Sequence, residues 1–426
     1  MGLFQKIEDR ITRLRNGGSR FSTERMRHFA DRLDNPQDSL KIIHIAGTNG
    51  KGSTSAMLEA ILRGAGFSCG LFTSPHLLRI NERIQFNREE ISDADFVNVF
   101  LGIEEEAQKI GRENQELAPT FFEYIATLAF SYFKEKNAAW AVIETGLGGR
   151  LDATNIVNPK LCVITSIGMD HMQFLGSSIE EIAAEKAGII KKNIPVVCGI
   201  ISDEAMRIIE KIAREQNAPL YKVVDFYPNF SELKTSLAGE YQKKNAATAL
   251  LAIKILNEIG QTDIAEADAK TALLSIRWDA RWQNIRLKSG NIILDCSHNS
   301  EGAKELEKNL QHLCETYGEK PIVAVGVLGR ERAVPLLESI SKYAKKILFI
   351  EAKEERALTF GELADCLPQN HPEFENTSLE KLFPQKNTCA IPSEKIPLVC
   401  TGSCYLAGEI LARINTERKD SLNDKL

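Results

Sequence analysis

Hydrophobic and polar positions between residues 41 and 276 alternate between two patterns. Short apolar runs of the kind that forms buried parallel strands occupy residues 41–46, 68–72, 138–143, 161–167, 195–201 and 219–224. Stretches with apolar residues at helical spacing lie among them, at 91–111, 120–134, 179–187, 204–217, 241–259 and 265–276. This alternation predicts a mainly parallel α/β sheet with right-handed crossovers.

The same rhythm starts again near residue 286. Strands are predicted at 291–295, 321–327, 346–351 and 398–401, and helices at 301–317, at 333–344 and from 402 onward. Residues 367–397 are rich in proline and are predicted to be mostly loop. Because a chain of 426 residues is also too long for one ordinary core, we predict two α/β domains. They span residues 1–284 and a smaller, Rossmann-like 285–426.

The glycine-rich segment after the first predicted strand is the main candidate for chemistry. Its residues are Gly47, Thr48, Asn49, Gly50, Lys51, Gly52, Ser53 and Thr54. Glycines let backbone N–H groups approach an anion, Lys51 adds a mobile charge, and the Ser53 hydroxyl suits magnesium. The loop departs from the standard pattern, because Ile45 stands where the first glycine is expected and Gly52 separates the lysine from the serine. A glycine turn without a ligand is the alternative, but the flanking strand and helix favour a P-loop-type ATPase domain.

Two further candidates carry charge, and one segment is ambiguous. Glu144 ends a predicted buried strand just before several glycines, at the sheet edge where α/β proteins bind ligands, which favours a magnesium ligand. Lys186 lies on a predicted helix and, from that pattern alone, is expected to be a surface lysine. Residues 74–87 crowd charged side chains after a Ser-Pro-His sequence and are expected, without further context, to form a solvated loop.

Composition excludes several functional classes. A net charge of −5 and a pI near 5.9 argue against a general nucleic-acid binder. The nine cysteines are scattered without a CxxC pair, so we expect buried thiols in a reducing compartment rather than a disulfide framework or a zinc site. No uncharged run approaches the length of a membrane span, and the N-terminus has no secretory signal pattern. We expect a cytoplasmic protein with no membrane partner.

Several segments, in order along nearly the whole chain, resemble the folylpolyglutamate synthase and dihydrofolate synthase family of the Mur-ligase superfamily. They are HIAGTNGKGS (44–53), SPHLLRINERI (74–84), PTFFEYIATLAF (119–130), VIETGLGGRLDATN (142–155), DHMQFLGSSIEEIAAEKAGIIK (170–191), GEYQKKNAATA (239–249), DCSHNSEG (295–302) and TGSCY (401–405). An ordered set of this kind is far more specific than any one motif.

The resemblance implies an ATP-dependent ligase. It would join L-glutamate to dihydropteroate, or to the γ-carboxyl of a reduced folate, through an acyl phosphate. By similarity, Ser53 and Glu144 hold one magnesium ion, and Glu144 with His171 holds a second. The lysine of EKAGI is carbamylated in this family, so the resemblance makes Lys186 a ligand of the second ion and overturns its assignment as a surface lysine.

The resemblance also implies contacts to the two larger substrates. Residues similar to those that contact ATP are Asn245, Arg281, Asp295 and His298. Residues that correspond to the pterin-binding region are Arg83, Phe122, Asp152 and Ala153. These implications assign the first domain to ATP and pterin binding and the second to contacts with glutamate and ATP. No nucleic-acid partner is implied, and we expect a monomer.

The chain departs from the family pattern at three places. Ala280 stands where relatives usually have glycine, Tyr241 where they have histidine, and residues 328–332 (LGRER) replace an Asp-Lys-Asp signature. The last change puts residue roles in that loop in doubt. A muramyl-peptide ligase and a nucleotide-dependent switch protein are the alternatives to a folate ligase. The sequence does not separate a bifunctional enzyme from a monofunctional one, although the complete pterin-site segments favour the bifunctional form.

Overall fold

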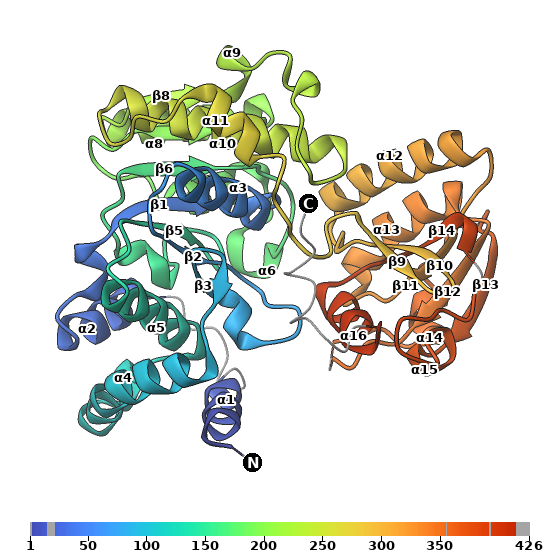
Figure 1. The fold of residues 1–426 in the computed structure, drawn as a ribbon, viewed down its shortest axis with the longest axis horizontal. Coiled ribbons are helices and arrows are strands. Elements are labelled where there is room, and N and C mark those ends of the chain that lie inside the picture. The colour runs from blue at the N-terminus through green and yellow to red at the C-terminus, as the bar shows by residue number, and fades with distance from the viewer. Residues whose placement is uncertain (1, 15–21, 355, 392, 415–426) are drawn as a thin grey trace. The chain divides into compact units, whose positions relative to one another are not determined.

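The structure is a computed structural model that describes residues 2–14, 22–354, 356–391 and 393–414 (Figure 1). Its contacts divide the chain into two compact units. The first unit comprises residues 1–236 and 241–276, and the second comprises 237–240 and 277–426. The chain passes from the first unit to the second after Ile276, whereas the sequence analysis placed the boundary after residue 284. One reason is that the backbone N–H of Trp282 donates to the Asp295 carboxylate at 3.0 Å, which ties this segment to the second unit.

The first unit contains an eight-stranded sheet in the order β4-β3-β2-β5-β1-β6-β7-β8. The strands are β1 (Lys41–Ala46), β2 (Cys69–Phe72), β3 (Ile84–Phe86), β4 (Glu89–Glu90), β5 (Trp140–Glu144), β6 (Leu161–Ile164), β7 (Val196–Cys198) and β8 (Leu220–Lys222). Only β3 and β4 run antiparallel to their neighbours, so the predicted mainly parallel sheet is confirmed. All residues of β2 and β5 are buried, as expected for strands covered on both faces.

Helices of the first unit pack around this sheet (Figure 1). They are α1 (Leu3–Arg13), α2 (Thr23–Arg32), α3 (Lys51–Gly64), α4 (Asp93–Glu113), α5 (Phe121–Glu135), α6 (Met172–Leu175), α7 (Ile179–Ala187), α8 (Asp203–Glu215), α9 (Val223–Phe226), α10 (Glu240–Glu258) and α11 (Glu266–Ala272). Short 3₁₀ turns occupy Pro36–Ser39, Ile80–Arg83, Gln115–Leu117, Ala153–Ile156 and Phe230–Glu232. The helix α5 begins with a capping box, in which Thr120 and Glu123 each accept from the other's backbone N–H.

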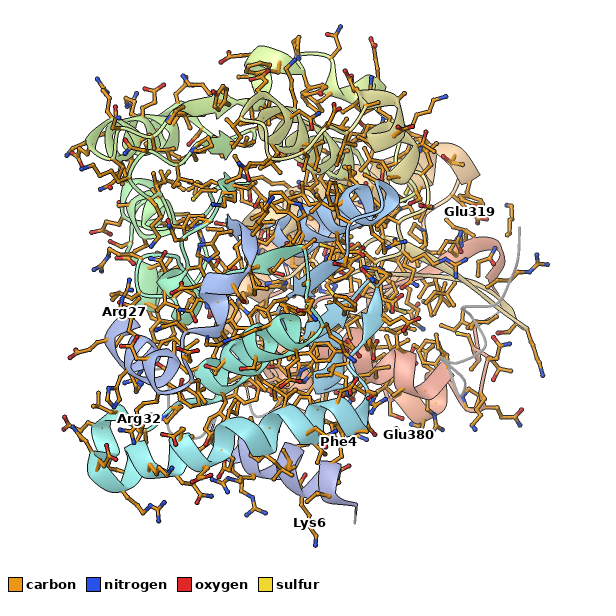
Figure 2. The ribbon with its side chains drawn as sticks, turned by 60° about the vertical axis from the view of Figure 1, so that its left-hand side comes forward. Phe4, Lys6, Arg27, Arg32, Glu319 and Glu380 are labelled. Carbon is orange, nitrogen blue, oxygen red and sulfur yellow. The ribbon has the colours of Figure 1, made fainter. Side chains whose placement is uncertain are left out.

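Polar contacts fix the N-terminal helices on the rest of the unit. Arg32 of α2, labelled in Figure 2, forms ion pairs with Glu106 and Glu113 of α4. Arg25, also on α2, donates from Nε to both carboxylate oxygens of Glu123 at 2.9 Å, and both side chains are buried. The second contact therefore joins α2 to the first turn of α5 inside the protein.

The second unit contains a six-stranded sheet in the order β13-β12-β11-β14-β10-β9. The strands are β9 (Gln283–Leu287), β10 (Gly290–Leu294), β11 (Ile322–Val325), β12 (Lys346–Ile350), β13 (Glu373–Thr377) and β14 (Ser393–Thr401). The helices are α12 (Ser300–Tyr317), α13 (Arg330–Tyr343), α14 (Phe360–Ala364), α15 (Leu379–Leu382) and α16 (Cys404–Ile414). All strand pairs are parallel except β9 with β10. The two-domain α/β fold class is therefore confirmed.

The expectation for residues 367–397 was right, and the one for residues 74–87 was wrong. Residues 367–397 are rich in loops, although they also contain β13, α15 and the start of β14. The sequence concealed β13 because this edge strand is polar and has only one neighbour. Residues 74–87 are not a solvated loop, because Asn81, Glu82 and Arg83 are buried. The Glu82 carboxylate accepts backbone N–H groups from residues 77, 78 and 79 at 2.8–2.9 Å and thereby folds the segment around itself.

Candidate functional site

The glycine-rich loop joins β1 to α3, as the sequence predicted, and its shape depends on two glycines. Gly47 has a φ of +154°, and a Cβ atom there would lie 2.0 Å from the Thr165 hydroxyl oxygen. Gly50 is the N-cap of α3 with a φ of +83°, and a Cβ atom would lie 2.4 Å from the Asn245 amide oxygen. Side chains at these positions would therefore displace the loop from the elements on which it rests.

Residues that follow β6 hold this loop in place. The Thr48 backbone N–H donates to the Ser166 carbonyl oxygen at 2.8 Å, and the Asn49 N–H donates to the Ser166 hydroxyl at 2.9 Å. The Thr48 hydroxyl donates to the Gly168 carbonyl oxygen and accepts from the Gly168 N–H. These bonds fix the loop at the N-terminus of α3, whose first N–H groups have no partner within the helix. A fixed helix N-terminus of this kind suits an anion.

Two lysine side chains converge on one backbone oxygen of the loop. Lys51 Nζ lies 3.0 Å from the Gly47 carbonyl oxygen, and Lys186 Nζ lies 2.9 Å from the same atom. Lys186 is 4% exposed, so its assignment as a surface lysine was wrong. It is buried because Ile182, Ala183 and Ala187 of the same helix pack into the core. Burial, with the nearby positive charge of Lys51 as the second cause, lowers the pKa of Lys186 to about 7.

The candidate magnesium ligands follow the same edge of the sheet. Glu144 ends β5, opposite Ile45 of β1, and is 2% exposed. The Ser74 backbone N–H, just after β2, donates to a Glu144 carboxylate oxygen at 3.3 Å. His171 follows β6 with a left-handed φ of +51°, and its side chain is 35% exposed. Because β2, β5, β1 and β6 are parallel neighbours, the segments that follow them meet at one carboxyl edge.

Helix α10 contributes amide groups to the same loop. Asn245 Nδ2 donates to Gln242 Oε1 at 2.9 Å, and Gln242 Nε2 donates to the Ser53 hydroxyl at 3.3 Å. Both amide side chains are buried. This chain of hydrogen bonds connects α10 to the first turn of α3 and orients the Ser53 hydroxyl.

The Asp152 carboxylate organises the loop after β5. One oxygen accepts backbone N–H groups from Gly146 and Leu147 at 2.9 Å. The other accepts the Thr154 backbone N–H at 2.9 Å and its hydroxyl at 2.5 Å. Burial raises the pKa of Asp152, and these four bonds oppose that effect. Both carboxylate oxygens are thus engaged with the protein, which gives Asp152 a direct role in the shape of the loop.

Behind Asp152 lies a histidine that sequence reasoning did not select. His44 of β1 is fully buried, and its Nε2 lies 2.8 Å from the Thr154 hydroxyl oxygen. Because the hydroxyl donates its proton to Asp152, His44 Nε2 is the donor in this contact. Burial lowers the pKa of His44 to about 3, with Lys191 as a second cause. The neutral imidazole therefore supports Asp152 through Thr154.

Of the other predicted pterin-site residues, Phe122 and Ala153 lie at this loop, and Arg83 lies in the 3₁₀ turn before β3. The Phe122 ring packs on Gly146, where a Cβ atom would fall 2.5 Å from a ring carbon. Ala153 begins the 3₁₀ turn that Asp152 caps. Arg83 donates from Nε to His76 Nδ1 at 2.9 Å, and its guanidinium lies 5.3 Å from the centre of the Phe121 ring. The fold thus places an aromatic ring and a guanidinium on adjoining elements of the first unit.

The remaining predicted ATP contacts lie in the second unit. The Asp295 carboxylate accepts the backbone N–H groups of Trp282 and Ser297 at 3.0 and 2.8 Å. His298 Nδ1 lies 2.7 Å from the Cys296 carbonyl oxygen. Arg281 donates to the Ala280 carbonyl oxygen at 3.1 Å, and Ala280 has a φ of +56°, a conformation that glycine adopts more readily. Arg281, Asp295 and His298 therefore belong to one local structure.

Comparisons with known proteins place this arrangement in a family. The Mur ligase middle domain model matches residues 45–227. The dihydrofolate synthase/folylpolyglutamate synthase of Bacillus subtilis is 36% identical over 308 residues, which cover 67% of this chain and 71% of the relative. The folylpolyglutamate synthase of Lacticaseibacillus casei is 30% identical, with 89% of this chain and 91% of the relative covered. The chain belongs to the folylpolyglutamate synthase and dihydrofolate synthase family.

The similarity to solved structures of this family extends over nearly the whole chain. The crystal structure of the bifunctional folylpolyglutamate synthase/dihydrofolate synthase of Yersinia pestis, complexed with AMPPNP and a manganese ion, superposes with a TM-score of 0.80. It is 27% identical, and the match covers 97% of this chain and 98% of that chain. The Mur ligase segment includes the glycine-rich loop, Glu144, His171 and Lys186, so these candidates all lie in the part that the family model matches.

The residues of this family member fit a divalent metal by their chemistry. The Ser53 hydroxyl and the buried Glu144 carboxylate are hard oxygen donors of the type that magnesium prefers. Within the described residues, no group of three or more His, Cys, Asp and Glu side chains is arranged to hold a metal. This finding does not oppose the predicted ligand set, because two of its four members are a serine and a lysine.

Sequence reasoning missed three contributors to the site in this family member. Ser74 donates to Glu144, Gln242 orients Ser53, and His44 supports Asp152. Ser74 carried a usable signal, because it follows a strand predicted to end at the same sheet edge as Glu144. His44 and Gln242 carried none, because their roles depend on which elements pack together. None of the helices in the described ranges is both long enough and apolar enough to traverse a bilayer.

Proposed function

We propose that this chain is a bifunctional dihydrofolate synthase and folylpolyglutamate synthase. It is an ATP-dependent ligase that joins L-glutamate to dihydropteroate and to the γ-carboxyl of reduced folates. The observation that carries the proposal is the approach of Lys51 and Lys186 to one oxygen of a loop at a helix N-terminus, beside the buried Glu144. A monofunctional enzyme with either activity is the alternative.

The arrangement suits transfer of the γ-phosphate of ATP to a carboxylate. Such a transfer brings together several negative charges, so the site must supply positive charge and N–H donors. Lys51, the N-terminus of α3 and the loop N–H groups provide these donors around the phosphates. The carboxylate of the pteroate or folate attacks the γ-phosphorus, ADP leaves, and the glutamate amine then displaces phosphate from the acyl phosphate. An amide bond forms, and the amine releases a proton.

Magnesium and a modified lysine complete the proposed site. Ser53 and Glu144 would hold one ion, and Glu144, His171 and a carbamylated Lys186 a second; bound magnesium supplies further positive charge to the phosphate oxygens. Carbamylation joins the Lys186 amine to carbon dioxide and releases a proton, so it requires the neutral amine. The burial of Lys186 beside Lys51 favours that neutral form.

The substrates are assigned to the residues that resemble known contacts. Phe122 and Arg83 suit a flat, polar heterocycle because a ring can stack and a guanidinium can donate hydrogen bonds. Asp152 and Ala153 bound the same region through the loop backbone. Asn245, Arg281, Asp295 and His298 are each assigned to ATP by their resemblance to known contacts, and the second unit is assigned to glutamate.

The proposal extends to the state of the protein in the cell. The nine cysteines are free thiols in the structure, which is consistent with a reducing compartment, and we place the enzyme in the cytoplasm. We propose that it acts as a monomer. Light scattering from purified protein in solution tests this statement, and a mass of two chains contradicts it.

Phosphate release from ATP tests the central proposal. The assay contains magnesium, L-glutamate and either dihydropteroate or tetrahydrofolate. We expect turnover with both acceptors and dependence on glutamate in each case. Turnover with only one acceptor supports the monofunctional alternative, and absence of turnover with both refutes the folate assignment.

Substitution of Lys186 tests the role of the buried amine. Because Lys186→Met keeps the length of the side chain but removes the amine, we expect kcat to fall by about 100-fold or more. The exposed Lys192→Met is the matched control and is expected to retain activity. Equal activity in both variants would remove Lys186 from the mechanism. Carbon NMR with isotope-labelled bicarbonate tests the carbamate itself. The native chain and the Lys192→Met control should both show its signal, and Lys186→Met should not.

A further inference from the structure

Two cysteines lie together at the carboxyl end of the second sheet. Cys296 follows β10, and Cys404 begins α16 just after β14. The two strands are parallel neighbours, with Leu294 opposite Cys400, and the Asp295 backbone N–H donates to the Cys400 carbonyl oxygen at 2.9 Å. Adjacent strand ends thus bring together two residues that are distant in sequence, and each thiol shifts the pKa of the other.

The surroundings of the two thiols differ. Cys296 is 4% exposed, whereas Cys404 is partly exposed. Arg281 and His298, which belong to the same local structure, act on the charge of the Cys404 thiol. The neighbouring Cys296 thiol, helped by Arg281, lowers the pKa of the Cys404 thiol, and the pKa of Cys296 is raised in return. Because Cys404 is the more exposed of the two, it is the nucleophile, and Cys296 is its sheltered neighbour.

Other cysteines of the chain lack this combination. Cys69, Cys162, Cys198 and Cys400 are buried, and burial raises the pKa of each thiol. Cys314 is partly exposed, but burial again raises its pKa. Reactivity toward disulfides depends on both access and thiolate character, so Cys404 stands apart.

We propose that Cys404 and Cys296 form a redox-reactive pair that is oxidised to a disulfide by low-molecular-weight disulfides such as oxidised glutathione. The Cys404 thiolate attacks one sulfur of the oxidant, forms a mixed disulfide and expels one thiolate. Cys296 then loses its proton and attacks the Cys404 sulfur, so that the internal bond forms and a second thiolate leaves. The protein loses two electrons and two protons, and one molecule of the oxidant is reduced to two thiols.

The disulfide acts on the residues assigned to ATP, and this consequence rests on the proposed function. The Cys296 carbonyl oxygen lies 2.7 Å from His298 Nδ1, so movement of Cys296 toward Cys404 displaces the partner of the histidine. Oxidation also removes the thiolate whose charge Arg281 stabilises. The oxidised chain therefore binds nucleotide more weakly, and bound nucleotide in turn stabilises the reduced form against oxidation.

Peptide mapping of the full chain tests the pair. The reduced protein is incubated under native conditions with oxidised glutathione, free thiols are blocked, and the digest is analysed by mass spectrometry. We expect a 296–404 disulfide and a loss of two hydrogen atoms from the intact mass. In Cys296→Ser, Cys404 should instead retain a stable glutathione adduct, and Cys314→Ser should behave like the native chain. Failure of Cys404 to react faster than Cys314, or absence of the internal bond, overturns the proposal.

Nucleotide titration tests the consequence separately. Calorimetry with ADP compares the reduced chain, the oxidised chain and oxidised Cys314→Ser. We expect about tenfold weaker binding after oxidation, restored by a reductant, and equal affinities refute the coupling to nucleotide. Disulfide formation requires no ligase activity, so a chain that forms the bond but does not ligate glutamate contradicts only the proposed function.

Discussion

Acid should weaken the first unit through His44, and the effect can be calculated from its surroundings. His44 Nε2 donates to Thr154, whereas within the described part of the chain its buried Nδ1 has no hydrogen-bond partner. A second proton would reside on Nδ1, in a fully buried site near Lys191, which is why the pKa is lowered to about 3 from an ordinary value of 6.5. The folded chain therefore stays unprotonated at His44 over a range in which the unfolded chain takes up a proton.

The sign and size of the effect follow from these two pKa values. Above pH 6.5 neither state is protonated at His44, so this residue adds no pH dependence. Below pH 6.5 each further pH unit favours the unfolded chain by about 1.4 kcal/mol, until the folded pKa near 3 is reached. At pH 4.5 the first unit should therefore have lost about 2.7 kcal/mol of stability through His44, and near pH 3 roughly 4–5 kcal/mol.

Hydrogen exchange in urea measures this loss where it acts. Mass spectrometry of peptides from β1 gives the free energy of opening of that strand at pH 7.5 and pH 4.5. The native chain is compared with His44→Gln, because the glutamine amide can still donate to Thr154. The native chain should lose about 2.7 kcal/mol more than the variant between these pH values. Titration of Asp152 and of other groups common to both chains largely cancels in the difference. Substitution of the exposed His312 with Gln is the matched control and should not change the loss. An equal loss in the native chain and His44→Gln would refute the reasoning.

Two further substitutions test the loop and the N-terminal helices. Gly50→Ala should lower stability by about 1–3 kcal/mol and weaken ATP binding, because Gly50 combines a positive φ with a close contact to α10. Gly66→Ala is the control, because Gly66 also has a positive φ but has open space around it. Calorimetric titration should show an unchanged ATP affinity for the Gly66→Ala variant. Arg25→Met should cost about 3–5 kcal/mol in urea unfolding because it leaves the buried Glu123 carboxylate without its guanidinium partner. Arg32→Met, at a partly exposed ion pair, is the control, and a loss as large as that in Arg25→Met would show that burial does not set the cost.

The sequence predicted those helices and strands whose hydrophobic pattern is complete within their own residues. The strand β1 and the helix α7 have the predicted bounds, because a continuous apolar run and a capped amphipathic stretch each mark their own ends. The edge strands β9 and β13 were missed, since a strand with one neighbour needs no apolar run. Helical periodicity indicates which faces are apolar, but it does not show that Lys186 points to the oxygen of Gly47.

The site shows the same limit at the level of single side chains. Motifs placed Ser53, Glu144 and the glycine-rich loop at one sheet edge, because topology alone brings strand ends together. They did not show that both carboxylate oxygens of Asp152 accept hydrogen bonds from the backbone of its own loop, or that His44 donates to Thr154 next to it. Those contacts depend on the packing of β1 against the 3₁₀ turn after β5, which no local pattern contains.

The shared position of Lys51 and Lys186 has a consequence for ligand selection. The Lys51 ammonium already has an acceptor in the Gly47 carbonyl oxygen, so a ligand must replace a neutral dipole as the partner of this lysine. A ligand with little charge gains nothing from that exchange, whereas a polyphosphate offers Lys51 a stronger partner. The loop oxygen is thus a weak substitute for the ligand, which Lys51 shares with the neutral amine of Lys186 and leaves when a dense negative charge arrives.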